Sequence, residues 1–182
     1  MKKYEFTGET KRVELWNRTA TLHRIKATVE FGFVKVGELG GWIEKEENLS
    51  HEGKAWVCGD AEVWGNAKVC GDAKVCGDAK VCGDAEVWGN AKVCGDAKVC
   101  GDAKVFLASH VLVMGSVGSR NDFTTFFRDK DNEITVKCGC FLGKIDKFLE
   151  KVTQTHGNNK YALVYRAAVE VAKLQIELTE RK

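Results

Sequence analysis

Long apolar runs are missing from this sequence of 182 residues. No stretch approaches the ~20 apolar residues that a membrane-spanning helix needs. The opening MKKYEFTGETKRVELW carries lysines but lacks the apolar core of a secretory signal. We therefore expect a cytoplasmic protein without a membrane partner. In a reducing compartment the eight cysteines should remain thiols rather than form a disulfide framework.

The sequence also lacks a large excess of either charge, because 28 basic and 26 acidic residues give a formal net charge of only +2 at pH 7. In the middle of the chain lysines alternate with aspartate and glutamate, so there is no basic stripe for a phosphate backbone. Nucleic acid is therefore not expected as a partner. Histidine is limited to four residues, which leaves few candidates for general acid–base chemistry.

A repeat of six residues dominates the middle of the chain. Eight hexads run without interruption from Ala55 to Asp102, and they read AKVCGD five times, AEVWGN twice and AWVCGD once. A helix would scatter the valines around its circumference, because six is not close to a multiple of 3.6. In an extended chain, Ala and Val point to one side and Lys and Cys or Trp to the other, while Gly-Asp or Gly-Asn supplies a bend.

Three such hexads can close a triangle, so that each residue stacks on the one 18 positions later. Neighbouring strands would then lie about 4.8 Å apart. The spacing predicts a parallel β-helix whose interior is filled by Val and Ala.

The phrase Val-x-Gly-Asp/Asn-Ala-x resembles the hexapeptide repeat of left-handed β-helix proteins, the superfamily of trimeric acyltransferases. The six-residue spacing continues at Val105, Val111 and Val117, so we expect the β-helix to span residues 55–118. With TLHRIKA and GELGGWIE ahead of it, the chain also looks like β-helix proteins encoded by phages and prophages. The resemblance implies a left-handed coil, a homotrimer and, in the acyltransferases, coenzyme-A-dependent acyl transfer with a histidine as general base.

Three outward rows of the predicted β-helix are unusually apolar for a surface. They contain Cys58, Cys76, Cys94 and Leu112 in the first row, Trp64, Cys82 and Cys100 in the second, and Cys70, Trp88 and Phe106 in the third. We interpret the rows as the interface of a homo-oligomer, expected to be a trimer. The alternative is a thiol ladder that binds metal or senses redox state, although collinear sulfurs do not give the tetrahedral arrangement that zinc prefers.

Residues 1–54 are predicted to form an N-terminal β cap. Positions 25, 27, 29, 31 and 33 are Ile, Ala, Val, Phe and Phe, and this alternation predicts a strand with one buried face. We expect Trp42 to plug the open end of the β-helix.

Residues 119–182 are predicted to form an α+β domain. FTTFFRDKDNEITVKCGCF indicates a hairpin of residues 123–128 and 133–141, with DKDN as the turn. Apolar residues at helical spacing follow from Ile145, and a second helix should run over about 159–180. The expected fold class is therefore mainly β: a left-handed parallel β-helix with an N-terminal β cap and a C-terminal tail of a hairpin and two helices.

The C-terminal domain concentrates the polar residues that do not repeat. Arginine and asparagine can hold a phosphate, and tyrosine can stack on a ring. The ligand-binding candidates are Arg120, Asn121, Arg128, His156, Tyr161 and Tyr165. Cys138, Cys140 and His156 could also supply three metal ligands, but we interpret them as two buried thiols and a helix-ending histidine. No metal and no cofactor are expected.

Two functions of different classes are compatible with these features. The first is a non-catalytic, phage-associated oligomeric module that sequesters a host defence protein or a small anionic signalling molecule through its end domains. The second is a coenzyme-A-dependent acyltransferase, for which His110, expected on an outer face of the coil, is the candidate base. We favour the binding module because no loop interrupts residues 55–106, and because the fold alone does not determine function.

Overall fold

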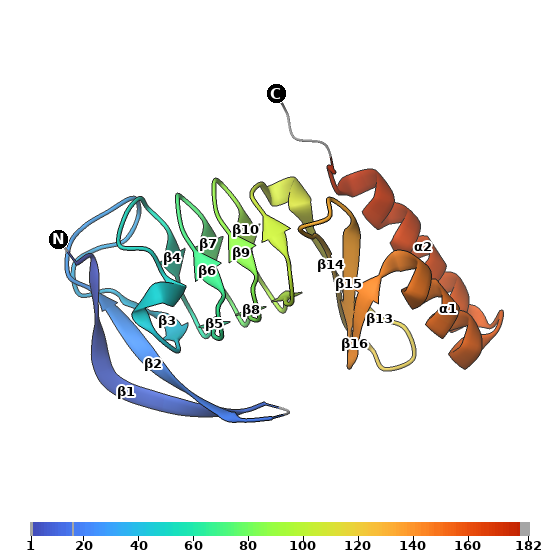
Figure 1. Cartoon of the computed structure of the whole chain (residues 1–182), viewed down its shortest axis with the longest axis horizontal. Coiled ribbons are helices and arrows are strands. Elements are labelled where there is room, and N and C mark those ends of the chain that lie inside the picture. Colours follow the sequence, from blue (N-terminus) through green and yellow to red (C-terminus); the bar gives the residue numbers. More distant parts are fainter. Residues whose placement is uncertain (1, 16, 179–182) are drawn as a thin grey trace.

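The computed structural model describes residues 2–15 and 17–178. Figure 1 shows an elongated molecule with a long hairpin at the N-terminal end, stacked coils in the middle, and a sheet with two helices at the C-terminal end. None of the described helices is long and apolar enough to cross a membrane.

The N-terminal region is a small antiparallel sheet that continues into the coils. Strand β1 (Tyr4–Glu14) pairs with β2 (Thr19–Ala27), and β2 pairs with β3 (Leu39–Ile43). Strand β3 then pairs in parallel with β5 (Glu62–Val63) of the coils, and the short 3-10 helix η1 (Glu46–Asn48) leads into the first coil. The predicted strand through residues 25–33 is therefore confirmed only as far as Ala27. Beyond it the chain turns, and Phe33 is 85% exposed.

Tyr4, rather than Trp42, closes the N-terminal end of the core. The buried Tyr4 belongs to the same apolar cluster as the inward residues of the coils, and its hydroxyl donates toward the carbonyl oxygens of Glu46 and Leu49 at 3.0 and 2.9 Å. Trp42 instead lies on the outside, where Lys11 Nζ is 4.8 Å from the centroid of its ring. The prediction for Trp42 is wrong because alternation along β3 sends the next residue, Ile43, inward.

The middle of the chain forms a parallel β-helix with one two-residue strand per hexad. The strands are β4 (Trp56–Val57), β5 (Glu62–Val63), β6 (Lys68–Val69), β7 (Lys74–Val75), β8 (Lys80–Val81), β9 (Glu86–Val87), β10 (Lys92–Val93), β11 (Lys98–Val99) and β12 (Lys104–Val105). They stack as β4-β7-β10, β5-β8-β11 and β6-β9-β12, with each residue over the one 18 positions later. The alanines and valines of the hexads are buried inside. The parallel β-helix and its Val and Ala core are confirmed.

The bend of each hexad depends on its glycine. Gly83 has a φ of +71°, in the left-handed region that glycine adopts readily. A Cβ at this position would also lie 2.8 Å from the backbone nitrogen of Gly101 on the next coil. Both the backbone angle and the close stacking therefore require glycine.

The parallel stacking ends at Val105, and the predicted continuation through Val111 and Val117 is wrong. A short 3-10 helix, η2 (Ala108–His110), follows, and then the seven-residue strand β13 (Val111–Val117) joins an antiparallel sheet. In the hexad that begins at Ala103, Leu107 occupies the position at which the other hexads have glycine. The bend that glycine permits is therefore lost here. Without glycine the chain does not fold back into another coil.

The C-terminal region is a four-stranded antiparallel sheet covered by two helices. The strands β13, β14 (Asp122–Arg128), β15 (Ile134–Cys138) and β16 (Phe141–Lys144) lie in sequence order. Helices α1 (Ile145–His156) and α2 (Lys160–Gln175) follow. The predicted hairpin around DKDN is confirmed, but its second strand ends at Cys138, because a turn at residues 139–140 separates β15 from β16. Both predicted helices are confirmed. The second ends at Gln175 rather than near residue 180, and residues 179–180 of that prediction lie outside the described residues.

Strand β14 joins the two halves of the molecule through the alternation of its side chains. Phe127 is buried in the cluster formed by the valines and alanines of the coils. Its neighbour Phe126 is buried in a second cluster with residues of α1 and α2, such as Phe148 and Val169. One strand therefore contributes to both apolar cores.

Candidate functional site

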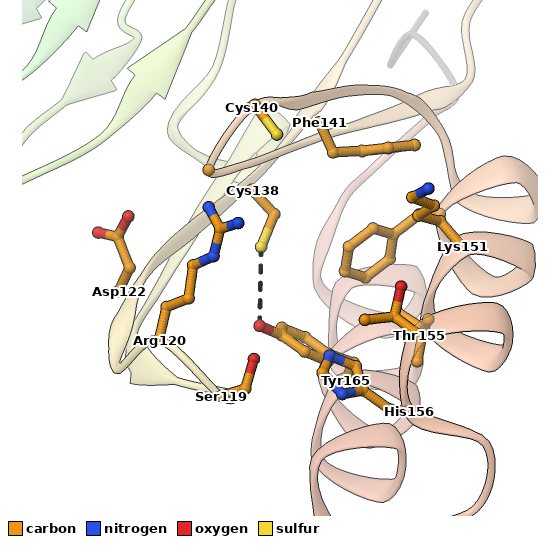
Figure 2. A pocket seen from close by; sticks show the side chains of 13 residues that line it. Ser119, Arg120, Asp122, Cys138, Cys140, Phe141, Lys151, Thr155, His156 and Tyr165 are labelled. Carbon is orange, nitrogen blue, oxygen red and sulfur yellow. Dashed lines mark hydrogen bonds between the residues drawn. The ribbon is translucent and has the colours of Figure 1, made fainter.

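A pocket of about 160 Å³ opens in the C-terminal region, between the end of the sheet and the two helices. Figure 2 shows side chains that converge on it from the loop after β13, from the turn between β15 and β16, and from both helices. Its lining is formed by Ser119, Arg120, Asp122, Cys138, Gly139, Cys140, Phe141, Phe148, Lys151, Val152, Thr155, His156 and Tyr165.

Aromatic rings form the inner wall of the pocket. The ring of Phe148 on α1 meets that of Tyr165 on α2 edge-on, with centroids 5.5 Å apart. Phe141 lies 5.4 Å from Phe148, and the ring of His156 stacks on Tyr165 at 5.9 Å. Such a wall presents flat apolar surface against which a planar ligand can pack.

The hydroxyl of Tyr165 reaches the sheet through a gap left by glycine. A Cβ at Gly118 would lie only 1.9 Å from Tyr165 Oη. Cys138 Sγ lies 3.9 Å from the same oxygen, and Thr124 donates to this sulfur at 3.3 Å. Burial and the adjacent Cys138 thiol raise the pKa of Tyr165, so the phenol stays protonated at neutral pH.

Two positively charged side chains, those of Arg120 and Lys151, line the pocket. Arg120 comes from the loop between β13 and β14, whereas Lys151 comes from the last half of α1, and Figure 2 shows them on opposite sides of the site. Within residues 2–15 and 17–178, neither forms an ion pair with a carboxylate. Gly139 lets the guanidinium approach closely, since a Cβ there would lie 2.9 Å from Arg120 Nη1. One carboxylate, that of Asp122, also lines the pocket.

The structure brings together half of the ligand-binding candidates. Arg120, His156 and Tyr165 line the pocket, and the ring of Tyr161 lies next to it, 5.8 Å from that of His156. Asn121 occupies the exposed turn after Arg120 with a φ of +48° and does not line the pocket.

Arg128 lies elsewhere, at the junction with the coils. Its side chain is almost fully buried, its Nε donates to Asn132 Oδ1 at 2.7 Å, and its guanidinium stacks on Phe106 at 5.0 Å. Arg128 therefore lies apart from Arg120, because the last residue of β14 and the loop before it lie at opposite ends of a seven-residue strand.

His110 does not lie on an outer face as predicted. It is only 2% exposed, and its Nδ1 accepts a hydrogen bond from the backbone nitrogen of Phe106 at 3.2 Å. The expectation failed because the six-residue register already ends at Val105. The 3-10 turn η2 then directs the imidazole inward.

Cys138, Cys140 and His156 all line the pocket but do not form a metal centre. In the described part of the chain, no group of three or more His, Cys, Asp or Glu side chains is placed to hold a metal ion. Cys138 is engaged with Thr124 and Tyr165, and Cys140 is exposed in the turn after β15.

Sequence reasoning missed several lining residues, chiefly Lys151, Thr155 and Phe148. Helical spacing could have found two of them, because Lys151 and Thr155 are four residues apart and share one face of α1. Their approach to Arg120 depends on how α1 packs against the sheet, which no local pattern encodes.

No family model matches the sequence, and none of the curated proteins is significantly similar to it.

Proposed function

We propose that the protein is a binding module that holds a small anionic molecule in the C-terminal pocket, with the β-helix as its rigid support. The observation that carries the proposal is the pair of cations, Arg120 and Lys151, beside an aromatic wall. Neither cation forms an ion pair within the described part of the chain, and such side chains in a partly enclosed site favour a ligand that supplies the opposite charge.

The chemistry of the lining favours a phosphate or carboxylate attached to a planar ring. A guanidinium offers a planar fork of donors that matches such an anion, and an ammonium adds a second positive charge. The protonated phenol of Tyr165 and the hydroxyls of Ser119 and Thr155 can donate further hydrogen bonds. Since the pocket measures about 160 Å³, it suits a single ring rather than a large cofactor.

The surroundings of His156 favour ligand binding over nucleophilic catalysis. A catalytic thiol or hydroxyl needs a base within hydrogen-bonding reach. In the described chain His156 contacts the rings of Tyr161 and Tyr165, and it forms no hydrogen bond with Cys138 or Ser119.

The resemblance to phage proteins supports a narrower version, in which the ligand is a small signalling molecule of host defence and the module acts as a homotrimer. The outward apolar rows are consistent with subunit contacts, since Trp88 is exposed and its ring packs on Phe106 at 4.3 Å. Native mass spectrometry of protein purified from its expressing cells should show a trimer with a retained small mass for each subunit. A monomer without added mass would contradict this version.

Replacement of Arg120 by Gln tests the pocket itself. Phenyl phosphate is a suitable probe because it combines one ring with one phosphate. We expect Arg120→Gln to weaken its binding by about 10- to 100-fold, since hydrogen bonds to charged groups contribute about 1.5–3 kcal/mol. Isothermal titration calorimetry or ligand-observed NMR can measure the change.

Arg12→Gln provides the matched control, because it removes the same charge from an exposed position on β1. This variant should bind phenyl phosphate as the wild type does. Phenol should bind more weakly than phenyl phosphate to the wild type. An equal loss in both arginine variants, or equal binding of phenol and phenyl phosphate, would contradict the proposed site.

A further inference from the structure

Two pairs of cysteines stand directly above one another on neighbouring coils. Cys82 follows β8 and Cys100 follows β11, and their sulfurs lie 2.8 Å apart. Cys76 follows β7 and Cys94 follows β10, and their sulfurs lie 2.6 Å apart. In both pairs the sulfurs approach more closely than ordinary non-bonded atoms do.

The backbone already has the spacing that a disulfide requires. Strands β8 and β11 are in parallel register, with Val81 beside Val99, and Cys82 N donates to Val99 O at 3.0 Å. Neighbouring strands lie about 4.8 Å apart, within the range of about 4.4–6.8 Å between the Cα atoms of disulfide-linked cysteines. A bond between stacked cysteines therefore needs rotation of side chains but no rearrangement of the coils.

The two pairs differ in their surroundings. The hydrogen bond from Cys82 lowers the pKa of Cys100 in spite of burial, and Lys137 and Lys98 add to this effect. By contrast, burial and the contact with Cys76 raise the pKa of Cys94 to about 12. Since the thiolate is the form that attacks a disulfide, the pair with Cys100 should react first.

We propose that Cys82 and Cys100 form a reversible redox site, in which a small-molecule disulfide such as oxidised glutathione links two neighbouring coils by a covalent bond. The thiolate of Cys100 attacks one sulfur of the oxidant, forms a mixed disulfide and releases one glutathione thiolate. Cys82, once deprotonated, attacks the sulfur of Cys100 and releases the second. The two protons lost by the cysteines appear on two molecules of reduced glutathione, so two protein thiols are oxidised and one disulfide is reduced.

Identification of the linked residues must take account of the repeat. Trypsin cleaves after lysine, so Cys70, Cys76, Cys94 and Cys100 all end up in the identical peptide VCGDAK. Cys82 lies in the distinct peptide VCGDAEVWGNAK. The proposed bond therefore gives a recognisable product, VCGDAEVWGNAK linked to VCGDAK, and serine variants assign the second cysteine.

The test treats the full chain with oxidised glutathione, blocks free thiols with N-ethylmaleimide in denaturant, and analyses the unreduced tryptic digest by mass spectrometry. We expect the linked peptide in the wild type, its loss on reduction, and its absence from Cys100→Ser. Cys70→Ser is the matched control, since the residues stacked at 18 positions on either side of Cys70 are Glu52 and Trp88 rather than cysteines. The linked peptide should persist in this control and in Cys94→Ser.

A second readout follows the stability of the folded chain. Closure of a short loop by a disulfide should raise the Tm by roughly 5–10 °C, and a reductant should reverse the shift. In a Cys94→Ser background, which removes the other stacked pair, the shift should persist, whereas adding Cys100→Ser or Cys82→Ser should abolish it. The proposal is overturned if the linked peptide survives in Cys100→Ser, if the wild type yields only glutathione adducts, or if an oligomer contact leaves both thiols unmodified.

Discussion

Val81→Asp should unfold the β-helix. Val81 is fully buried and stacks in register between Val63 and Val99, so the new carboxylate would lie among valine and alanine side chains. Loss of the valine packing costs about 1–3 kcal/mol, and burial of an unpaired charge adds several kcal/mol more. The sum is comparable with the roughly 5–15 kcal/mol that stabilises a typical domain. Far-UV circular dichroism and urea unfolding measure the effect.

Two further variants distinguish the effect of the buried charge in Val81→Asp from the effects of adding an aspartate and of removing a valine. Lys92→Asp places the same carboxylate on an exposed position of β10 and should change the free energy of unfolding by less than about 0.5 kcal/mol. Val81→Thr keeps the shape of the side chain but buries a hydroxyl, at a cost of about 1–3 kcal/mol. If Val81→Asp had the urea midpoint of the wild type, the inward direction of this row would be wrong.

The second large effect is expected at Asp129, where the turn of the hairpin meets the last coil. Asp129 is 4% exposed, and its carboxylate accepts hydrogen bonds from Lys144 Nζ at 2.6 Å and Thr135 Oγ1 at 2.5 Å. It also accepts from the backbone nitrogens of Asp131 and Glu133 at 3.0 and 3.2 Å. Asp129→Ala leaves these donors without their acceptor and should lower the free energy of unfolding by about 3 kcal/mol.

The same carboxylate should make stability depend on pH in the acid range. Burial on its own would raise the pKa of Asp129, but the hydrogen bonds from Lys144 and Thr135 outweigh it and hold the pKa below its usual value of 3.8. A carboxyl group whose pKa is lower in the folded state stabilises the fold above the unfolded value. This contribution is lost as the pH falls from about 4 through the folded pKa.

Urea unfolding at pH 7 and pH 3 tests this dependence. Asp129→Asn does not titrate at that position and should lose less stability between the two pH values than the wild type. Asp131→Asn is the control, because Asp131 is exposed and meets Lys144 at 3.3 Å, and it should change stability at pH 7 by less than about 1 kcal/mol. Equal stability of Asp129→Ala and wild type would show that the buried network contributes nothing.

The coils could be predicted from the sequence because their determinants are local. The period of six, the alternation within each hexad and the glycine at each bend repeat without interruption, so the inward rows of Val and Ala follow directly. Valine spacing alone failed at Val111 and Val117, since it does not distinguish another coil from a straight strand. The missing glycine at Leu107 was the better signal.

The pocket could be predicted only in part, because it is assembled by packing between distant segments. Arg120, His156 and Tyr165 stood out as polar residues in a non-repeating region, and the structure places them together. Arg128 looked equivalent but contacts Phe106 instead. Lys151 was overlooked because its position beside the sheet depends on the angle at which α1 packs.

Strand β14, which contributes to both apolar cores, also covers the C-terminal end of the β-helix. A parallel coil presents unpaired peptide groups at its end, and another coil of the same sequence fits them as well as its own neighbours do. Here β14 and the turn after it cover that end: Lys98 N donates to Thr125 Oγ1 of β14 at 2.9 Å, and Lys130 N of the turn donates to Asp102 O at 3.0 Å. By covering the edge to which a further coil could pair, the C-terminal region limits the β-helix to the coils of its own chain.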